Sequence, residues 1–288
     1  MPIKIPTGIP SGKVLENEQI FVMSSERAYH QDIRPLQILL VNLMPNKQET
    51  ESQFFRLLGN SPLQVEAHLI YTASHTPKHT SGQYLGRFYK TFRDIEERYF
   101  DGMIITGAPV EHLEFEEVDY WRELCRIMDW STTHVFSSLY ICWAAQAGLY
   151  HFYNVPKHPL KKKCFGVFPH RLLCDPAMEL FRGFDDEFYV PHSRHTELRT
   201  EDLEKVDAVE ILAASDEAGV MASWDEENRR FFITGHVEYD PDTLKNEYFR
   251  DLKKGLEINI PMNYFPDDDP SKEPIVRWRS SANLLFSN

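Results

Sequence analysis

His134-Val-Phe-Ser-Ser-Leu-Tyr-Ile-Cys-Trp-Ala-Ala-Gln-Ala-Gly148 is the stretch from which the architecture of this chain is most directly inferred. It begins as an apolar strand, reaches Cys142, and continues at once into small residues that suit a helix. A side chain at such a corner points off the carboxyl edge of a sheet, with the first amides of the next helix behind it. Because those amides favour a thiolate, the position predicts a nucleophilic cysteine. The alternative is a small buried core residue, the commoner role of a free cysteine.

Three apolar segments precede this stretch and alternate with helical patterns. Residues 36–43 form a nearly continuous apolar run, residues 63–69 alternate apolar and polar side chains, and residues 100–106 form a short apolar strand. We expect helices over residues 48–58, 88–99 and 120–130. This alternation predicts a doubly wound, mostly parallel α/β sheet with helices on both faces. Active sites of such sheets gather at the carboxyl ends of the strands.

The second half of the chain has a more mixed pattern. Strand-like segments lie at residues 165–168, 188–190, 209–213 and 230–234. Residues 1–35 are rich in proline and polar groups, which indicates an arm on the surface or on a neighbouring subunit. No linker divides the remainder, so we expect residues 36–288 to form a single catalytic domain.

The composition limits the classes of partner. The net charge of the 288 residues is −13, which argues against nucleic acid or an anionic membrane as the main partner. No apolar run approaches the length of a membrane-spanning helix, and no signal region opens the chain, so we expect a cytoplasmic protein. The four cysteines are expected to be reduced and lack zinc-site spacing, so we expect no bound metal. A symmetric homodimer is the expected oligomer.

A cysteine nucleophile needs a base, and the base needs an orienting group. The segment Phe231-Phe-Ile-Thr-Gly-His-Val-Glu-Tyr239 supplies both, because Glu238 follows His236 by two residues, on the same side of an extended chain. We expect a helix directly afterwards, with Asp240 as its cap and Pro241 at its first position. His-x-Glu is a weak pattern by itself, and a solvated turn is the alternative.

Further residues suggest binding roles. Pro191-His-Ser-Arg-His195 predicts a polar loop that positions a small substrate through Ser193 and Arg194, with a two-histidine metal site as the weaker alternative. One lysine of residues 161–163 is a candidate partner for a substrate carboxylate or a phosphate, unless the run is only a solvated surface. Arg250 lies in the helix expected after His236 and is eligible for the same role.

Six blocks of the sequence resemble the homoserine O-acyltransferases of bacterial methionine synthesis, in the branch related to class I glutamine amidotransferases. They lie in order along essentially the whole chain: Asn42-Leu-Met-Pro-Asn-Lys-Gln-Glu-Thr50, Phe92-Arg-Asp-Ile-Glu96, Ile105-Thr-Gly-Ala-Pro-Val110, Ile141-Cys-Trp-Ala-Ala-Gln-Ala-Gly148, Pro191-His-Ser-Arg-His-Thr-Glu197 and Val276-Arg-Trp-Arg279. The resemblance implies a flavodoxin-like, amidotransferase-like fold. It also implies ping-pong transfer of an acyl group from acyl-CoA to Cys142 and then to the hydroxyl of L-homoserine, with no permanently bound cofactor.

The resemblance assigns a role to each candidate residue. His236 would be the general acid/base, and Glu238 would orient it. Homoserine would be held by Lys163, Ser193 and Arg250. The oxyanion hole would be formed by the amides of Gly107 or Ala108 and of Trp143.

The donor is implied by Glu111, because in this family glutamate at that position goes with acetyl-CoA and glycine with succinyl-CoA. A glutamate beside the acyl pocket fills space and opposes a second carboxylate, whereas an acetyl group meets neither penalty. We therefore expect transfer of an acetyl group from acetyl-CoA. The alternatives are succinyl transfer, an amidotransferase-like hydrolase, and a non-enzymatic module in which Cys142 senses redox state.

Overall fold

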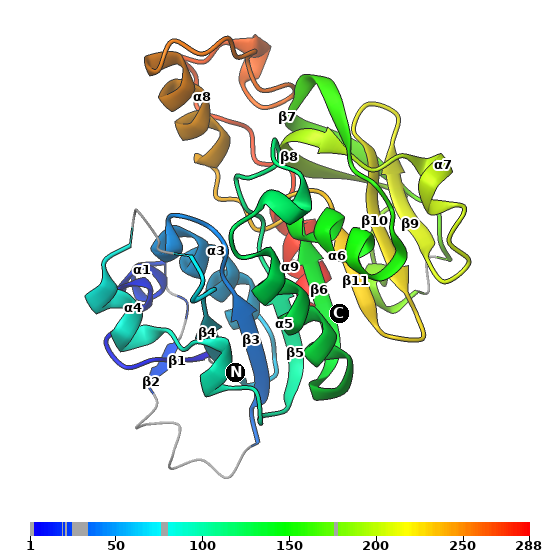
Figure 1. Cartoon of the computed structure of the whole chain (residues 1–288). Coiled ribbons are helices and arrows are strands. Elements are labelled where there is room, and N and C mark those ends of the chain that lie inside the picture. The colour runs from blue at the N-terminus through cyan, green and yellow to red at the C-terminus, as the bar shows by residue number, and fades with distance from the viewer. Residues whose placement is uncertain (1–2, 19, 21, 25–33, 76–79, 176–177) are drawn as a thin grey trace.

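The structure is a computed structural model that describes residues 3–18, 20, 22–24, 34–75, 80–175 and 178–288. One continuous sheet crosses the described residues, with its strands in the order β2-β1-β4-β3-β5-β6-β11-β10-β9-β7-β8. Figure 1 shows this sheet as the centre of the molecule, with helices packed against it. No helix in these ranges is long and apolar enough to cross a membrane.

The parallel half of the sheet carries the strands expected from the apolar runs. They are β3 (Leu36–Val41), β4 (Val65–Ile70), β5 (Phe100–Ile105), β6 (Val135–Ile141) and β11 (Arg230–Ile233), and all neighbouring pairs among them are parallel. The chain runs from β3 to β4 on one side and then to β5 on the other side of β3. The direction of winding therefore reverses between β3 and β5.

Helices cover both faces of this half because side chains alternate along each strand. Leu39 and Ile105 pack on one face against α5 (Trp121–His134) and α6 (Trp143–Tyr153). Leu40 and Ile104 pack on the other face against α3 (Lys47–Gly59) and α9 (Arg279–Ser287). The predicted doubly wound α/β fold is confirmed.

The antiparallel half consists of β7 (His158–Leu172), β8 (Glu187–Glu197), β9 (Glu210–Ser215) and β10 (Gly219–Asp225). Three of these strands contain the strand-like segments noted in the sequence, whereas β10 was not predicted. In Figure 1, β7 and β8 lie at the same end of the molecule as α8 (Thr243–Lys253). This half therefore brings a helix and a strand pair together beside the carboxyl edge of the parallel strands.

The described part of residues 1–35 extends the sheet. β1 (Ile3–Ile5) pairs with β4 and with β2 (Val22–Ser24), and α1 (Pro10–Asn17) packs beside α3. Ile3 and Leu15 are fully buried. The division into an N-terminal arm and one catalytic domain stays a prediction. The shorter elements are α4 (Gly82–Phe88), α7 (Thr200–Leu203), η1 (Phe92–Asp94), η2 (Phe115–Glu117), η3 (Glu179–Phe181) and η4 (Pro266–Asp268).

The prediction of a helix over residues 88–99 is wrong. The helix α4 ends at Phe88, and the amide of Lys90 then bonds to the carbonyl of Leu69 at 2.9 Å, which holds the chain extended beside β4. Thr91 and Asp94 cap only a short 3₁₀ turn. The long-range bond to β4 therefore outweighs the helical spacing of the phenylalanines.

The helix expected at Asp240 begins later. α8 starts at Thr243 with Asp242 as its N-terminal flanking residue. The Asp240 carboxylate instead accepts a hydrogen bond from Arg56 of α3. This ion pair ties the segment after β11 to the helix on one face of the sheet.

Candidate active site

Cys142 lies at a sharp corner between β6 and α6. Its φ of 52° and ψ of −114° are rare for a residue with a side chain, and its amide bonds to the carbonyl of Ile233 at 2.7 Å. Trp143 opens α6, so its amide is among those that have no partner within the helix. This is the strand-to-helix corner that the sequence predicted, and it places the thiol beside donors suited to an oxyanion.

The strand β11 brings His236 to the same corner. β11 pairs in parallel with β6, with Ile233 opposite Ile141, so the residues after both strands leave the same edge of the sheet. A Cβ atom on Gly107 would lie 3.3 Å from both the Cβ of Cys142 and the Cε1 of His236. The imidazole is hydrogen-bonded to the Cys142 side chain, and a side chain at residue 107 would crowd both residues.

Glu238 orients the imidazole. The Nδ1 atom of His236 lies 2.7 Å from Oε1 of Glu238, which leaves Nε2 for the thiol. The ring of Tyr239 stacks on that of His236 at 4.1 Å. Burial would lower the pKa of His236, but the Cys142 sulfur and the Glu238 carboxylate raise it well above its ordinary value. The arrangement favours a protonated imidazole beside the Cys142 sulfur.

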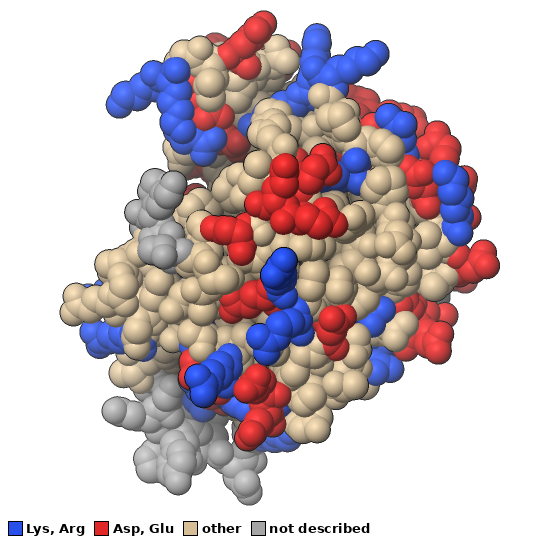
Figure 2. Space-filling model, in the orientation of Figure 1, with Lys and Arg blue, Asp and Glu red and all other residues tan. Residues whose placement is uncertain are grey.

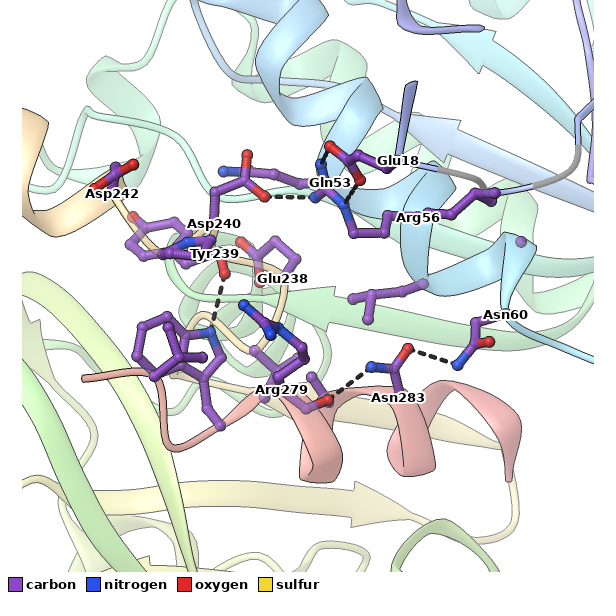
Figure 3. A pocket seen from close by; sticks show the side chains of 18 residues that line it. Glu18, Gln53, Arg56, Asn60, Glu238, Tyr239, Asp240, Asp242, Arg279 and Asn283 are labelled. Carbon is purple, nitrogen blue, oxygen red and sulfur yellow. Dashed lines mark hydrogen bonds and ion pairs between the residues drawn. The ribbon is translucent and has the colours of Figure 1, made fainter. Parts of the chain in front are cut away.

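The second carboxylate oxygen of Glu238 is buried and has no hydrogen-bond partner among the described residues. Glu238 also lines a cavity of about 800 Å³ between α3, α9 and the segment after β11 (Figure 3). Arg56 bridges part of its wall by pairing with Glu18 and Asp240. Cys142 does not line this cavity. Of Cys142, His236 and Glu238, only Glu238 lines this cavity.

Glu111 lies against the sulfur. Its Oε1 atom is 3.9 Å from Sγ of Cys142, and its Oε2 atom accepts a hydrogen bond from the amide of His195 at 2.6 Å. Burial raises the pKa of Glu111, although the His195 amide and nearby positive charges act in the opposite direction. An acyl group on the sulfur would therefore share its space with this carboxyl group.

The three residues expected to hold homoserine meet at one carboxylate. Glu247 of α8 lies 2.6 Å from Nζ of Lys163 on β7 and accepts hydrogen bonds from Ser193 of β8 at 2.9 Å. The Nη2 atom of Arg250 lies 3.4 Å from the same carboxylate. Sequence reasoning missed Glu247. The available signal was chemical, because the predicted set held only cations and a hydroxyl, whereas an amino acid also needs an anion for its ammonium group.

The predicted oxyanion donors also share this edge. Gly107 and Ala108 follow β5, and β5 pairs in parallel with β6, with Ile105 opposite Tyr140. Gly107 and Ala108 thus leave the sheet at the same edge as Cys142 and Trp143.

The prediction of a polar loop at residues 191–195 is wrong, because these residues lie within β8. Alternate side chains of a strand face opposite sides. Ser193 therefore faces α8, while Arg194 is buried and donates to the carbonyls of Thr196 and Ala218. In the part of the chain that the structure describes, no group of three or more His, Cys, Asp or Glu residues is placed to hold a metal ion.

A family model described as homoserine O-succinyltransferase matches residues 2–288. The chain belongs to this family. It is therefore an acyltransferase, and the resemblance drawn from the sequence blocks is confirmed.

Similar proteins are named for acetyl transfer, whereas the family model is named for succinyl transfer. The chain is 59% identical to the homoserine O-acetyltransferase of Acetivibrio thermocellus and 58% identical to that of Brevibacillus brevis. Each alignment covers all of this chain and 94% of the relative.

Solved structures support the fold assignment. A glutamine amidotransferase from Thermotoga maritima superposes with a TM-score of 0.57 at 11% identity, covering 88% of this chain and 96% of that one. A glutamine amidotransferase from Methylobacillus flagellatus gives 0.55 at 11% identity, over 89% and 92% of the two chains. The predicted amidotransferase-like fold is confirmed.

Proposed function

We propose that the protein transfers an acetyl group from acetyl-CoA to the hydroxyl of L-homoserine through a thioester on Cys142. The observation that carries this proposal is the contact of Glu111 with the sulfur, at 3.9 Å, in a site where His236 and Glu238 are already paired. Names of the close relatives support the acetyl donor. A cytoplasmic location and a homodimer stay predictions from the sequence.

In the first half-reaction, the Cys142 thiolate attacks the carbonyl carbon of the acetyl thioester. The amides of Trp143 and of Gly107 or Ala108 stabilise the oxyanion of the tetrahedral intermediate. The bond from carbon to the CoA sulfur then breaks, and His236 gives its proton to the departing CoA thiolate. The products are the acetyl-enzyme and free CoA.

In the second half-reaction, His236 removes the proton of the homoserine hydroxyl as that oxygen attacks the acetyl carbon. The bond to the Cys142 sulfur breaks and restores the thiolate. Lys163 and Arg250 hold the substrate carboxylate, and Glu247 takes the ammonium group in place of its present cationic partners. The ester product leaves, and the imidazolium–thiolate pair is ready for the next donor.

Mass spectrometry tests the route directly. Incubation with acetyl-CoA and no acceptor should add one acetyl group, which peptide mapping should place on Cys142. The Cys142→Ser variant should remain free of a thioester, whereas Cys164→Ser should acetylate normally. Turnover without an adduct on Cys142, or an adduct on another residue that passes its acetyl group to homoserine, would contradict the route.

Succinyl-CoA is the second candidate donor, favoured by the description of the family model. Glu111 disfavours it, because a succinyl group would bring a second carboxylate beside this buried one. Comparing kcat/KM for the two donors with homoserine as acceptor distinguishes them. In Glu111→Gly, the preference should shift toward succinyl-CoA, since the space and the repulsive charge are both removed. An unchanged preference would remove Glu111 from donor selection.

A further inference from the structure

We propose, on the basis of the proposed function, that the cavity at the carboxyl ends of β3 and β5 holds the pantetheine arm of the acyl-CoA donor. The cavity has a volume of about 500 Å³, within the ordinary range for small-molecule sites. Its walls are mainly apolar, and the residues that matter here are Leu43, Pro109, Val110, Leu113, Val118 and Tyr120.

The position of the cavity in the sheet favours ligand binding. Leu43 follows β3 and Pro109 follows β5, the two strands between which the winding reverses. Loops that follow such strands diverge to opposite faces, so a crevice opens outside their carboxyl ends. In open α/β sheets, this crevice is where ligands bind.

One wall of the cavity lies next to residues of the candidate active site. Val110, on its wall, directly precedes Glu111, whose carboxyl group lies 3.9 Å from Sγ of Cys142. Tyr120, also on its wall, packs edge-on against Trp143, with ring centroids 6.1 Å apart. Trp143 follows Cys142 in the chain. A linear thioester that extended from this cavity past Glu111 would present its acyl end to the nucleophile.

The polar groups of the cavity suit a neutral amide. The Tyr120 hydroxyl is buried and has no hydrogen-bond partner among the described residues. Burial raises the pKa of Tyr120, so the group stays protonated and able to donate. A buried donor without a partner is costly, and an amide carbonyl would satisfy it. Pantetheine combines two such amides with methylene and methyl groups that match the apolar walls.

The acidic side chains near the cavity disfavour the phosphates of CoA there. The ammonium group of Lys157 is also close, but it donates to the carbonyls of Glu111 and Leu113. Glu117 and Asp119 line it, and Glu114 and Glu116 are exposed on the same segment. Figure 2 shows a group of acidic side chains near the middle of one face of the molecule, with basic side chains beside it. Lys47 also lines the cavity, but its Nζ donates to the carbonyls of Asn42 and Met44 at 2.6 and 3.0 Å. The occupant is therefore the uncharged arm, and the nucleotide lies outside.

Leu113→Trp tests the proposal by narrowing the cavity. Leu113 is 42% exposed, so the larger ring can be accommodated without disturbing the core. The rate of acetyl transfer to Cys142 is measured with acetyl-CoA and with p-nitrophenyl acetate, which has no arm. We expect kcat/KM for acetyl-CoA to fall at least tenfold relative to that for p-nitrophenyl acetate. Leu63→Trp is the matched control, because Leu63 is 54% exposed and precedes β4 at the opposite edge of the sheet.

Tyr120→Phe tests the hydrogen bond with little change of shape. We expect the affinity for pantetheine, measured by titration calorimetry, to fall by about 2- to 10-fold, the range for one lost hydrogen bond. Equal affinity in the wild-type protein and this variant would remove Tyr120 from the site.

The outcomes separate this proposal from the proposed function. A wild-type protein that acetyl-CoA never acetylates would overturn the proposed function, and this proposal with it. If the wild-type protein is acetylated but Leu113→Trp slows both donors equally, or neither, the arm lies elsewhere and only this proposal fails.

Discussion

Cys142 has backbone angles that side-chain-bearing residues rarely adopt, and the chain holds them from both sides. Its amide bonds to Ile233, and its carbonyl accepts bonds from the amides of Ala145 and Gln146 at 3.0 and 3.3 Å. Strain of this kind costs about 1–3 kcal/mol and persists only where neighbours fix it. The result is a buried sulfur that interacts with both His236 and Glu111.

Glu238→Gln should lower kcat by at least about 100-fold, with little change in KM for homoserine, because it weakens the imidazolium and no substrate contact. The Glu238 carboxylate helps to raise the pKa of His236. Its loss should lower that pKa, so the imidazole loses its proton at a lower pH. The alkaline limb of the pH–rate profile should therefore shift to lower pH.

Asp225→Asn is the control for Glu238→Gln, because it removes another buried carboxylate, paired with Arg230 near the start of β11. It should leave the pH profile unchanged in folded protein. A Glu238→Gln enzyme with normal kcat and a raised KM would contradict the orienting role.

Glu247→Gln should raise KM for homoserine at least tenfold, since the ammonium group loses its charged partner. Acetylation of Cys142 by acetyl-CoA should continue, because Glu247 acts only on the acceptor. Pre-steady-state measurement of the two half-reactions separates these effects. Glu257→Gln, on an exposed residue beyond α8, is the control. Equal slowing of both half-reactions would indicate a structural role for Glu247.

Sequence patterns could predict Cys142, His236 and Glu238 as candidates but not Glu247. An apolar strand that ends in a cysteine before small residues is a local signal, and so is a glycine followed by His-x-Glu. The role of Glu247 depends on contacts 84 residues away at Lys163 and 54 residues away at Ser193. Only the folded sheet brings β7, β8 and α8 together, so no local pattern reports it.

Among the secondary-structure elements, α6 sets the position of the nucleophile and depends on a close approach to the sheet. A Cβ atom on Gly148 would lie 2.9 Å from the ring of Phe232 and 3.0 Å from that of Tyr140. Those two rings stack on each other at 5.0 Å, so neither can move freely. The absence of a side chain at residue 148 thus accommodates the bulky Tyr140 two positions before Cys142.

Gly148→Ala should destabilise the protein by about 1–3 kcal/mol, the usual cost of overpacking a core. Gly86→Ala is the matched control, because Gly86 is an exposed helical glycine with no atom within 4 Å of the added Cβ. It should be neutral or stabilise by up to about 1 kcal/mol through helix propensity. Urea denaturation measures both. Similar stability of the two variants would contradict this packing.

Errors of prediction at the level of elements have a common cause. Apolar runs predicted the parallel strands well, because both faces of those strands are covered. The segments at residues 88–99 and 191–195 were mispredicted because a distant strand fixes each of them. Lys90 bonds to Leu69, and Ser193 pairs with Phe165 of β7. The sequence of each segment alone contains no pattern that predicts such a pairing with a distant strand.

Across the whole molecule, buried histidines connect folding to pH. His170 and His192 are fully buried, with their Nε2 atoms 3.1 Å apart. Burial lowers the pKa of His170 to about 4 and holds that of His192 well below its ordinary value. The folded protein therefore keeps both rings neutral where an unfolded chain would protonate them.

The free energy of unfolding should consequently fall as the pH falls below about 6.5, the ordinary histidine value. The stabilisation that results from the low pKa values of His170 and His192 is fully present above that pH. It is lost progressively toward pH 4, because these two histidines bind protons in the unfolded state before they do so in the folded state. Between pH 6.5 and 5, His170 alone accounts for a loss on the order of 2 kcal/mol. Urea denaturation across this range tests it. His170→Gln should flatten the dependence, whereas a substitution of the exposed His112 should not; a flat wild-type profile would contradict the linkage.

The division of the sheet into a parallel and an antiparallel half has a practical consequence for enzyme redesign. Glu111, the residue proposed to select the donor, follows β5 of the parallel half, whereas the residues proposed to bind the acceptor, Lys163, Ser193 and Glu247, belong to β7, β8 and α8. The two groups of residues are joined at one point, because the amide of His195 on β8 holds the Glu111 carboxylate. Libraries that vary the acceptor side should therefore leave the backbone at His195 unchanged if donor preference is to stay intact. A graft of β7, β8 and α8 from a relative with another amino-alcohol substrate would retain the thiol chemistry and change what receives the acyl group, provided that the amide at residue 195 still reaches Glu111.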